Sequence, residues 1–183
     1  MNIFSFLRRR KPIPEPWAKY YTKEELNIKI PDISMYDQVK KSAHLYPNYI
    51  AYEYMGKKCL YKDFIEEINE WAKVFHSSGV KHGDIVTISL PNIPNVLVVL
   101  YALNKMGAIA NMVHPLSSEE EILFSLNSTK SKYLVMLNTF YNKIENVIGK
   151  SSVDAVIFAS AADYMPIYMK LFYNLSQIGK YKK

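Results

Sequence analysis

The side chains that could act as a nucleophile, a base or a metal ligand are few in this sequence. It has one cysteine, Cys59, and four histidines, with no His-x-x-x-His pair. His114 follows a predicted strand and is the best lone candidate for a catalytic base, but no orienting partner is evident for it. Cys59 lies on a predicted hairpin strand, where we expect it to pack rather than to react. The sequence therefore assigns no catalytic residue and no metal ligand.

The carboxylates and glycines add no further site. The pair Glu66-Glu67 and the run at residues 119–121 fall on predicted helices, where we expect solvated faces or partners of helix N-termini. The six glycines are isolated along the chain, and no Gly-x-Gly-x-x-Gly, Gly-x-x-x-x-Gly-Lys or Gly-x-Ser-x-Gly motif occurs. A phosphate needs several converging backbone N–H groups, so we expect no cofactor-binding residue and no cofactor bound by this chain alone.

The elements that would position such side chains alternate regularly between residues 34 and 160. After a predicted hairpin at residues 50–61, short apolar strands are predicted at residues 85–90, 109–113, 133–137 and 153–158. Helical spacing lies between and around them, at residues 36–46, 64–75, 94–106, 120–126 and 141–148. Nearly uniform apolar strands with short connectors predict an α/β fold, with a mostly parallel sheet covered by helices on both faces.

Several residue types mark the ends of these helices. Gly79 and Gly107 stand where left-handed C-caps are expected. Asn92 is a predicted N-cap, with Pro94 in the first turn that follows. The segment Ser117-Ser-Glu-Glu120 is typical of a capping box.

Net charge is +6, but the excess is concentrated at the two ends of the chain. Residues 8–11 are Arg-Arg-Arg-Lys, and Lys180, Lys182 and Lys183 close the sequence. No basic stripe with interleaved aromatics lies on one element, so a nucleic-acid partner is not expected. One thiol indicates a reducing compartment, and no signal peptide or run of about 18 apolar residues is present. These features together predict a cytoplasmic protein.

The composition and spacing of residues divide the chain into three expected segments. Residues 1–33 form a proline-rich leader, extended or loosely packed, and residues 34–160 form the α/β domain. Residues 161–183 form a basic amphipathic helical tail, with apolar side chains at helical spacing from Met165 to Ile178. Alone, this tail would suit peripheral contact with a membrane surface. The alternative, which we favour, is that it packs on a part of the protein outside this sequence.

The order of five segments carries a family resemblance. They are Leu60-Tyr-Lys-Asp-Phe64, Gly79-Val-Lys-His-Gly-Asp84, Pro91-Asn92, Leu103-Asn-Lys-Met-Gly-Ala-Ile109 and His114-Pro115. This order resembles the first third of the adenylate-forming superfamily, which includes AMP-forming acyl-CoA synthetases, luciferases and peptide-synthetase adenylation domains. The similarity runs from about Leu45 to Phe158. The closing segment, from Ser160 to Pro166, is similar to a connector that some fatty-acyl members carry before their nucleotide loop.

The sequence departs from the family pattern at three positions. Ile85 follows Asp84 where the family prefers a basic residue, Asn95 stands where a glutamate is common, and His114 replaces the usual asparagine. The resemblance also implies that the phosphate-binding loop, the adenine segment, the ribose-binding aspartate and the catalytic lysine would all follow Lys183. The chain is thus expected to be a truncated N-terminal portion of the synthetase.

The resemblance implies a two-step reaction for the parent enzyme. A carboxylate would attack the α-phosphorus of ATP, and the thiol of CoA would then displace AMP, with Mg²⁺ assisting. The chain alone is expected to be inactive in this reaction. Its expected partner is the remainder of the synthetase, and an exposed apolar surface would favour homo-oligomers. The alternative is a non-catalytic α/β module that binds a partner or regulates one. The sequence does not identify the carboxylic acid.

Overall fold

The computed structural model describes residues 15–177, and these belong to two compact units that divide between Asp32 and Ile33. The first unit contains a 3-10 turn, η2 (Ala18–Tyr20), and a short helix, α1 (Lys23–Leu26). Thr22 and Glu25 form a reciprocal capping box at the start of α1. The domain boundaries expected at residues 33 and 160 stay predictions.

The second unit contains a four-stranded parallel sheet with the strand order β4-β3-β5-β6. The strands are β3 (Ile85–Ser89), β4 (Ile109–Met112), β5 (Tyr133–Leu137) and β6 (Ala155–Ala159). All three pairings are parallel and in continuous register. Parallel strands need crossover connections, and helices supply each of them. The predicted α/β class is therefore confirmed.

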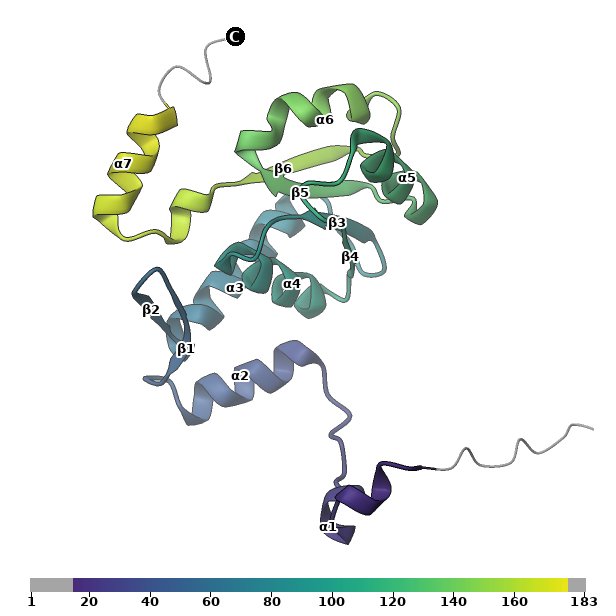
Figure 1. Ribbon diagram of the computed structural model, residues 1–183, viewed down its shortest axis with the longest axis vertical. Coiled ribbons are helices and arrows are strands. Elements are labelled where there is room, and N and C mark those ends of the chain that lie inside the picture. Colours follow the sequence, from purple (N-terminus) through teal and green to yellow (C-terminus); the bar gives the residue numbers. More distant parts are fainter. Residues whose placement is uncertain (1–14, 178–183) are drawn as a thin grey trace, which may run out of the picture. The chain divides into compact units, whose positions relative to one another are not determined.

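Helices cover both faces of this sheet (Figure 1). On one face lie α3 (Tyr61–Ser77) and α4 (Pro94–Met106), with α2 (Met35–Leu45) packed against both. On the other face lie α5 (Glu119–Thr129) and α6 (Tyr141–Ile148). Strand β5 shows the division, because Val135 packs in the α3–α4 core while Leu134 and Met136 pack under α5 and α6.

A β-hairpin precedes α3, and its tight turn follows from two residues with positive φ. Strands β1 (Ile50–Tyr54) and β2 (Lys57–Leu60) are antiparallel. Met55 and Gly56 join them with φ values of 50° and 79°. Two consecutive positive φ angles are typical of a two-residue hairpin turn whose twist matches that of the strands. The predicted hairpin is confirmed.

After β6 the chain forms a 3-10 turn, η4 (Ala161–Tyr164), and then the helix α7 (Ile167–Gln177). The tail was expected to have helical spacing from Met165, but Met165 is extended and Pro166 precedes the helix. The residue before a proline is disfavoured in the α region, which explains the break. Residue 178 onward, including the terminal lysines, lies outside the described residues.

Two expected helix starts are wrong by one residue. The N-cap of α4 is Ile93 rather than Asn92, because Ile93 precedes Pro94 and is forced into an extended conformation. The capping box of α5 joins Ser118 to Glu121, one residue beyond the expected pair. The N–H of Ser117 is instead used in a turn, where it donates to the carbonyl of His114 at 3.0 Å. The C-cap at Gly107 is confirmed, with a φ of 69°.

Candidate functional site

The strand order creates a switch point between β3 and β5. From β3 the chain crosses to β4 on one side and then returns to β5 on the other side. In open parallel sheets, ligands bind outside the carboxyl ends of the strands at such a point. Here the segment from Leu90 to Ile93 follows β3, and Asn138 follows β5. This carboxyl edge is therefore the candidate functional site.

Among residues 15–177, two asparagines near this edge have polar atoms without a hydrogen-bond partner. Asn95, in the first turn of α4, is 0% exposed, and both its amide nitrogen and its amide oxygen lack a hydrogen bond. The Oδ1 atom of Asn138 is also buried and unpaired. A buried polar group without a partner costs about 1–3 kcal/mol, so such groups usually mark a bound water, a ligand or a strained site. Both asparagines are candidates for contact with a group the chain itself does not supply.

His114, the predicted base candidate, has no acidic partner among its described hydrogen bonds. It is exposed beyond β4, and its Nδ1 atom accepts the backbone N–H of Leu116 at 3.2 Å. That bond belongs to a local turn and leaves the imidazole facing solvent. A catalytic base needs a second group that fixes its orientation. The geometry favours a structural turn residue at position 114.

The glycines of the family-like motifs come together at the opposite edge of the sheet, where the strands begin. The N–H of Gly83 donates to the carbonyl of Gly107 at 2.9 Å, although the two residues are far apart in sequence. A Cβ atom on Gly107 would lie 2.3 Å from Cδ2 of His82, and one on Gly79 would lie 3.3 Å from the Tyr133 hydroxyl. Gly79 and Gly107 thus serve close packing at the amino edge, whereas a Cβ on Gly83 would meet nothing within 4 Å. They do not line the carboxyl edge, where a phosphate would bind.

Asp84 ties the same amino edge together. One carboxylate oxygen accepts from Nζ of Lys132 at 2.9 Å, and the other accepts the N–H of Lys81 at 2.9 Å. Its backbone carbonyl accepts the N–H of Ile109, which starts β4. The hydrogen bonds from Lys132 and Lys81 hold the pKa of Asp84 below its usual value. The Gly-Asp motif therefore joins the starts of three strands.

A second candidate is a cavity of about 230 Å³ between the hairpin, α3 and η4. The hydroxyl of Tyr52 donates to Oε2 of Glu67 at 2.7 Å, and the Cys59 thiol lies 3.9 Å from Oε1. Burial raises the pKa of Glu67 and also that of Tyr52. Burial raises the pKa of the Cys59 thiol as well, so it is protonated at neutral pH and unreactive. Tyr164 lines the same cavity.

The expectation that Glu67 lies on a solvated face is wrong. Glu66 is exposed as expected, whereas Glu67 is half-buried beneath the hairpin. Glu67 lies three residues after Phe64 and four before Trp71, and this spacing places all three on one side of α3. That periodicity was the signal for its burial. The run at residues 119–121 does lie at the start of α5, as predicted.

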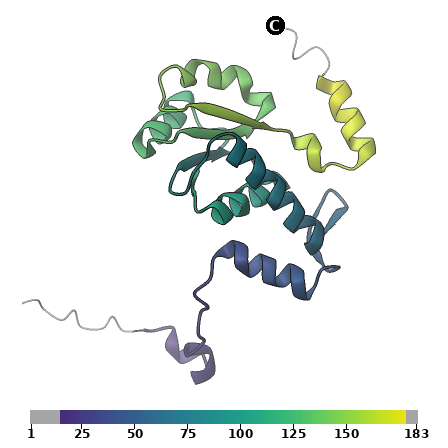
Figure 2. The ribbon, with the colours of Figure 1, turned by 180° about the vertical axis from the view of Figure 1, so that it is seen from behind.

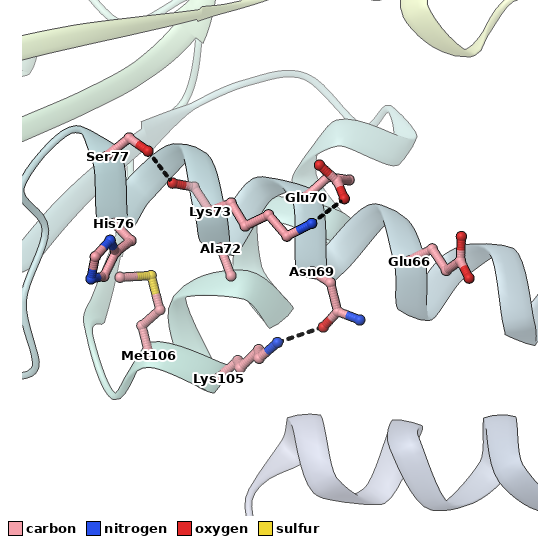
Figure 3. A pocket seen from close by; sticks show the side chains of 9 residues that line it. All are labelled: Glu66, Asn69, Glu70, Ala72, Lys73, His76, Ser77, Lys105 and Met106. Carbon is pink, nitrogen blue, oxygen red and sulfur yellow. Dashed lines mark hydrogen bonds and ion pairs between the residues drawn. The ribbon is translucent and has the colours of Figure 1, made fainter.

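A third candidate is an open groove of about 890 Å³ along α3 and the end of α4 (Figure 3). Both lysines of its lining pair with other residues of the groove. Nζ of Lys105 donates to Oδ1 of Asn69 at 2.5 Å, and Lys73 pairs with Glu70 at 2.7 Å. Because Lys73 and Glu70 are both largely exposed, their ion pair adds little. The groove holds no convergent set of buried polar groups.

The described residues lack the groups that would bind ATP and Mg²⁺. Between residues 15 and 177, no three His, Cys, Asp or Glu side chains are grouped closely enough to hold a metal ion. The carboxyl edge offers single asparagines and an exposed imidazole, and its strand-to-helix turns contain no glycine. The described residues therefore do not fit a triphosphate with its metal. None of the described helices is long and apolar enough to cross a bilayer.

Several curated proteins are similar to this chain in sequence. The long-chain-fatty-acid–CoA ligase of Bacillus subtilis (strain 168) is 26% identical over 167 residues, which cover 91% of this chain and 30% of the ligase. The 3-hydroxypropionyl-coenzyme A synthetase of Sulfurisphaera tokodaii is 26% identical, covering 69% of this chain and 21% of that enzyme. This chain thus spans less than a third of the length of these curated relatives.

Solved structures share the same architecture. A long-chain-fatty-acid-CoA ligase (FadD1) from Archaeoglobus fulgidus superposes with a TM-score of 0.67 at 19% identity, covering 75% of this chain and 30% of that one. At this identity the superposition supports the fold alone. The sequence pattern of the AMP-binding enzyme family, in contrast, matches residues 39–169, more than two thirds of the chain. The α/β unit whose amino edge is tied by Gly83, Asp84 and Gly107 therefore belongs to the AMP-binding enzyme family.

Proposed function

We propose that this chain forms the N-terminal scaffold of an ATP-dependent acyl-CoA ligase. Such a ligase converts a carboxylic acid, ATP and CoA into acyl-CoA, AMP and pyrophosphate. The observation that carries the proposal is the family match over residues 39–169, on a parallel sheet with helices on both faces. Because the Bacillus relative is named for long-chain fatty acids, we propose that class of substrate for the whole enzyme.

The chemistry of such a ligase explains why this scaffold should be inactive alone. The carboxylate and the α-phosphate repel each other, so the enzyme must supply cationic groups and backbone N–H donors at the developing charge. Within residues 15–177, the carboxyl edge offers Asn95, Asn138 and the exposed His114 instead. We propose that these residues support the packing of a further segment that carries the phosphate-binding groups.

A pyrophosphate-release assay tests the inactivity directly. Purified chain is incubated with ATP, Mg²⁺, CoA and palmitate, and the Bacillus ligase serves as the positive control. We expect no pyrophosphate above the protein-free background. Turnover by the chain alone would show that its own residues handle the phosphates, and would contradict the scaffold proposal.

Two measurements bear on the scaffold and on its alternative, a non-catalytic partner-binding module, and the second of them separates the two. AMP is titrated into the chain by isothermal calorimetry, and we expect no saturable binding. The coding sequence beyond Lys183 is then determined. A Ser/Thr/Gly-rich loop encoded there supports the ligase scaffold, whereas a stop codon together with a folded product supports the independent module.

A further inference from the structure

The cavity between the hairpin, α3 and η4, called here the hairpin cavity, has no role in the proposed reaction. Figures 1 and 2 both show the hairpin beside the start of α3 and the short segment between β6 and α7. The lining includes three tyrosines, Tyr52, Tyr54 and Tyr164, and the carboxylate of Glu67. The volume of about 230 Å³ lies below the roughly 300–1,000 Å³ of pockets for drug-sized molecules, so a ligand here would be small.

Glu67 is the half-buried charged group of the hairpin cavity. Its Oε2 atom accepts the Tyr52 hydroxyl at 2.7 Å, whereas the one described contact of Oε1 is the Cys59 thiol at 3.9 Å, a weak donor. Within the described part of the chain, no basic nitrogen lies within 4.0 Å of this carboxylate. Burial without a counter-ion disfavours the charged form, and it raises the pKa of Glu67. A cation that carries N–H groups would supply both the missing charge and the missing donor.

Aromatic rings surround the same space. The rings of Tyr52 and Tyr164 pack edge-to-face, with centroids 6.3 Å apart and an interplanar angle of 64°. A cation close to the face of such a ring is attracted by its quadrupole, more strongly where water is excluded. Two lysines of residues 15–177 lie over an aromatic ring, and neither lies over Tyr52, Tyr54 or Tyr164. The cavity therefore offers a carboxylate and ring faces that no described cation occupies.

The other charged groups of the lining are exposed. They are Lys57 and Lys58 on β2 and Asp63 on α3. Because these groups are open to water, their charges are screened more than that of the half-buried Glu67. An anion in the cavity would be repelled by Glu67, and a neutral apolar ligand would leave its Oε1 atom without a donor. The half-buried charge therefore favours a cation.

We propose that the hairpin cavity binds a small primary amine, whose ammonium group donates to Oε1 of Glu67 and lies against the tyrosine rings. A primary ammonium group has three N–H donors and is charged at neutral pH. A quaternary ammonium group has the charge but no donor, so it would leave Oε1 unpaired. This inference does not depend on the proposed ligase activity.

An NMR titration of the full 183-residue chain with butylamine at pH 7 tests the proposal. We expect saturable shifts of the backbone amide signals around the cavity, at residues 52–59, 67 and 164. The neutral 1-butanol has the same chain length, and we expect it to bind at least about tenfold more weakly. This comparison uses the unaltered chain, so it does not depend on the folding of a variant. Equal binding of the two probes would show a merely apolar pocket and would overturn the proposal.

Glu67→Gln tests the carboxylate itself. Glutamine keeps the length of the side chain and an oxygen that can accept the Tyr52 hydroxyl, but it removes the charge. We expect butylamine to bind at least about tenfold more weakly to this variant, with the fold checked by circular dichroism. Glu66→Gln is the matched control, because Glu66 is exposed at the neighbouring position of α3 and does not line the cavity. Equal losses in both variants would mean that the amine responds to the general charge of α3, which contradicts a specific site.

The competing cation is the chain's own Lys57, which also lines the cavity. Lys57 is exposed, and its amine lies beyond 4.0 Å from the Glu67 carboxylate. We therefore expect Lys57→Gln to retain butylamine binding. If the wild type shows no saturable shifts while Lys57→Gln does, Lys57 fills the site in solution and the proposal is wrong. If neither protein shows saturable shifts, the cavity binds no amine, and the proposal is equally overturned.

Discussion

The two edges of the parallel sheet differ in how completely their polar groups are paired. At the amino edge, Asp84 accepts two hydrogen bonds and Gly83 donates to Gly107. At the carboxyl edge, Asn95 and Asn138 keep buried polar atoms without partners. The family-like motifs Gly-Val-x-x-Gly-Asp and Lys-x-Gly-Ala both lie at the paired edge. Those motifs therefore stabilise the starts of the strands. The edge that could hold a ligand is the carboxyl edge, where buried polar atoms lack partners.

The largest predicted effect tests whether the amino edge depends on its glycines. Gly107→Ala places a Cβ at a φ of 69° and 2.3 Å from the His82 ring. We expect a loss of about 1–3 kcal/mol in the free energy of unfolding, measured by urea denaturation. Adding His82→Ala should remove the part of this loss that comes from the clash with the His82 ring. The part that comes from the positive φ at residue 107 should remain.

Gly149→Ala is the matched control for this change. Gly149 ends α6 with a φ of −63°, and no atom lies within 4 Å of an added Cβ. We expect a change within about 0.5 kcal/mol, or a small gain. Equal losses for Gly107→Ala and Gly149→Ala would show that the amino edge has no special need for glycine.

Much of this fold follows from local rules, because its glycines and prolines act on their own backbone. The positive φ at Gly56 lies in the turn that ends β1, and the positive φ at Gly107 ends α4. Neither depends on how the rest of the chain packs. The misplaced N-cap at Asn92 had a local signal too, since Pro94 forces Ile93 out of the helical region. Tertiary pairing was not predictable in this way. The contact of Gly83 with Gly107, and that of Asp84 with Lys132, depend on which strands become neighbours.

The candidate site was less accessible to sequence analysis than the fold. Asn95 precedes Val98, Val99 and Ala102 at helical spacing, so its place on the buried face of α4 could be inferred. That its amide finds no partner could not, because this depends on which groups the sheet brings within reach. Glu67 is similar, since its partner Tyr52 comes from the hairpin.

The second prediction tests the unpaired polar groups at the carboxyl edge. Asn95→Leu replaces an unpaired buried amide with an apolar group of nearly the same shape. We expect the free energy of unfolding to rise by about 1–2 kcal/mol in urea denaturation, because the cost of an unpaired polar group is removed.

Asn104→Leu on the same helix is the control. Asn104 is half-buried, but its Oδ1 atom accepts the N–H of Tyr36 at 2.9 Å, at the start of α2. We expect this variant to lose about 1–2 kcal/mol, because that N–H would lose its partner. If Asn95→Leu also destabilises, the Asn95 amide has a partner in solution, such as a bound water, and the contrast between the two edges fails at this residue.

The smallest predicted effect concerns the ion pair at the amino edge. Hydrogen bonds from Lys132 and Lys81 lower the pKa of Asp84, so its ionised form stabilises the folded state. This contribution is complete above the ordinary Asp pKa of about 3.9 and is lost as pH falls through the lowered pKa. Asp84→Asn should therefore cost most near pH 7, and the difference from wild type should shrink in acid.

The size of that cost is limited by solvent. The Lys132 side chain is 53% exposed, so solvent screens the pair and we expect its contribution to stability to be small. A double-mutant cycle with Asp84→Asn and Lys132→Ala isolates their coupling from the bond that Asp84 makes to the Lys81 N–H. If Asp84→Asn costs the same at pH 3 and pH 7, Asp84 acts through the shape of its side chain rather than its charge. The amino edge would then be held by its glycines and backbone bonds alone.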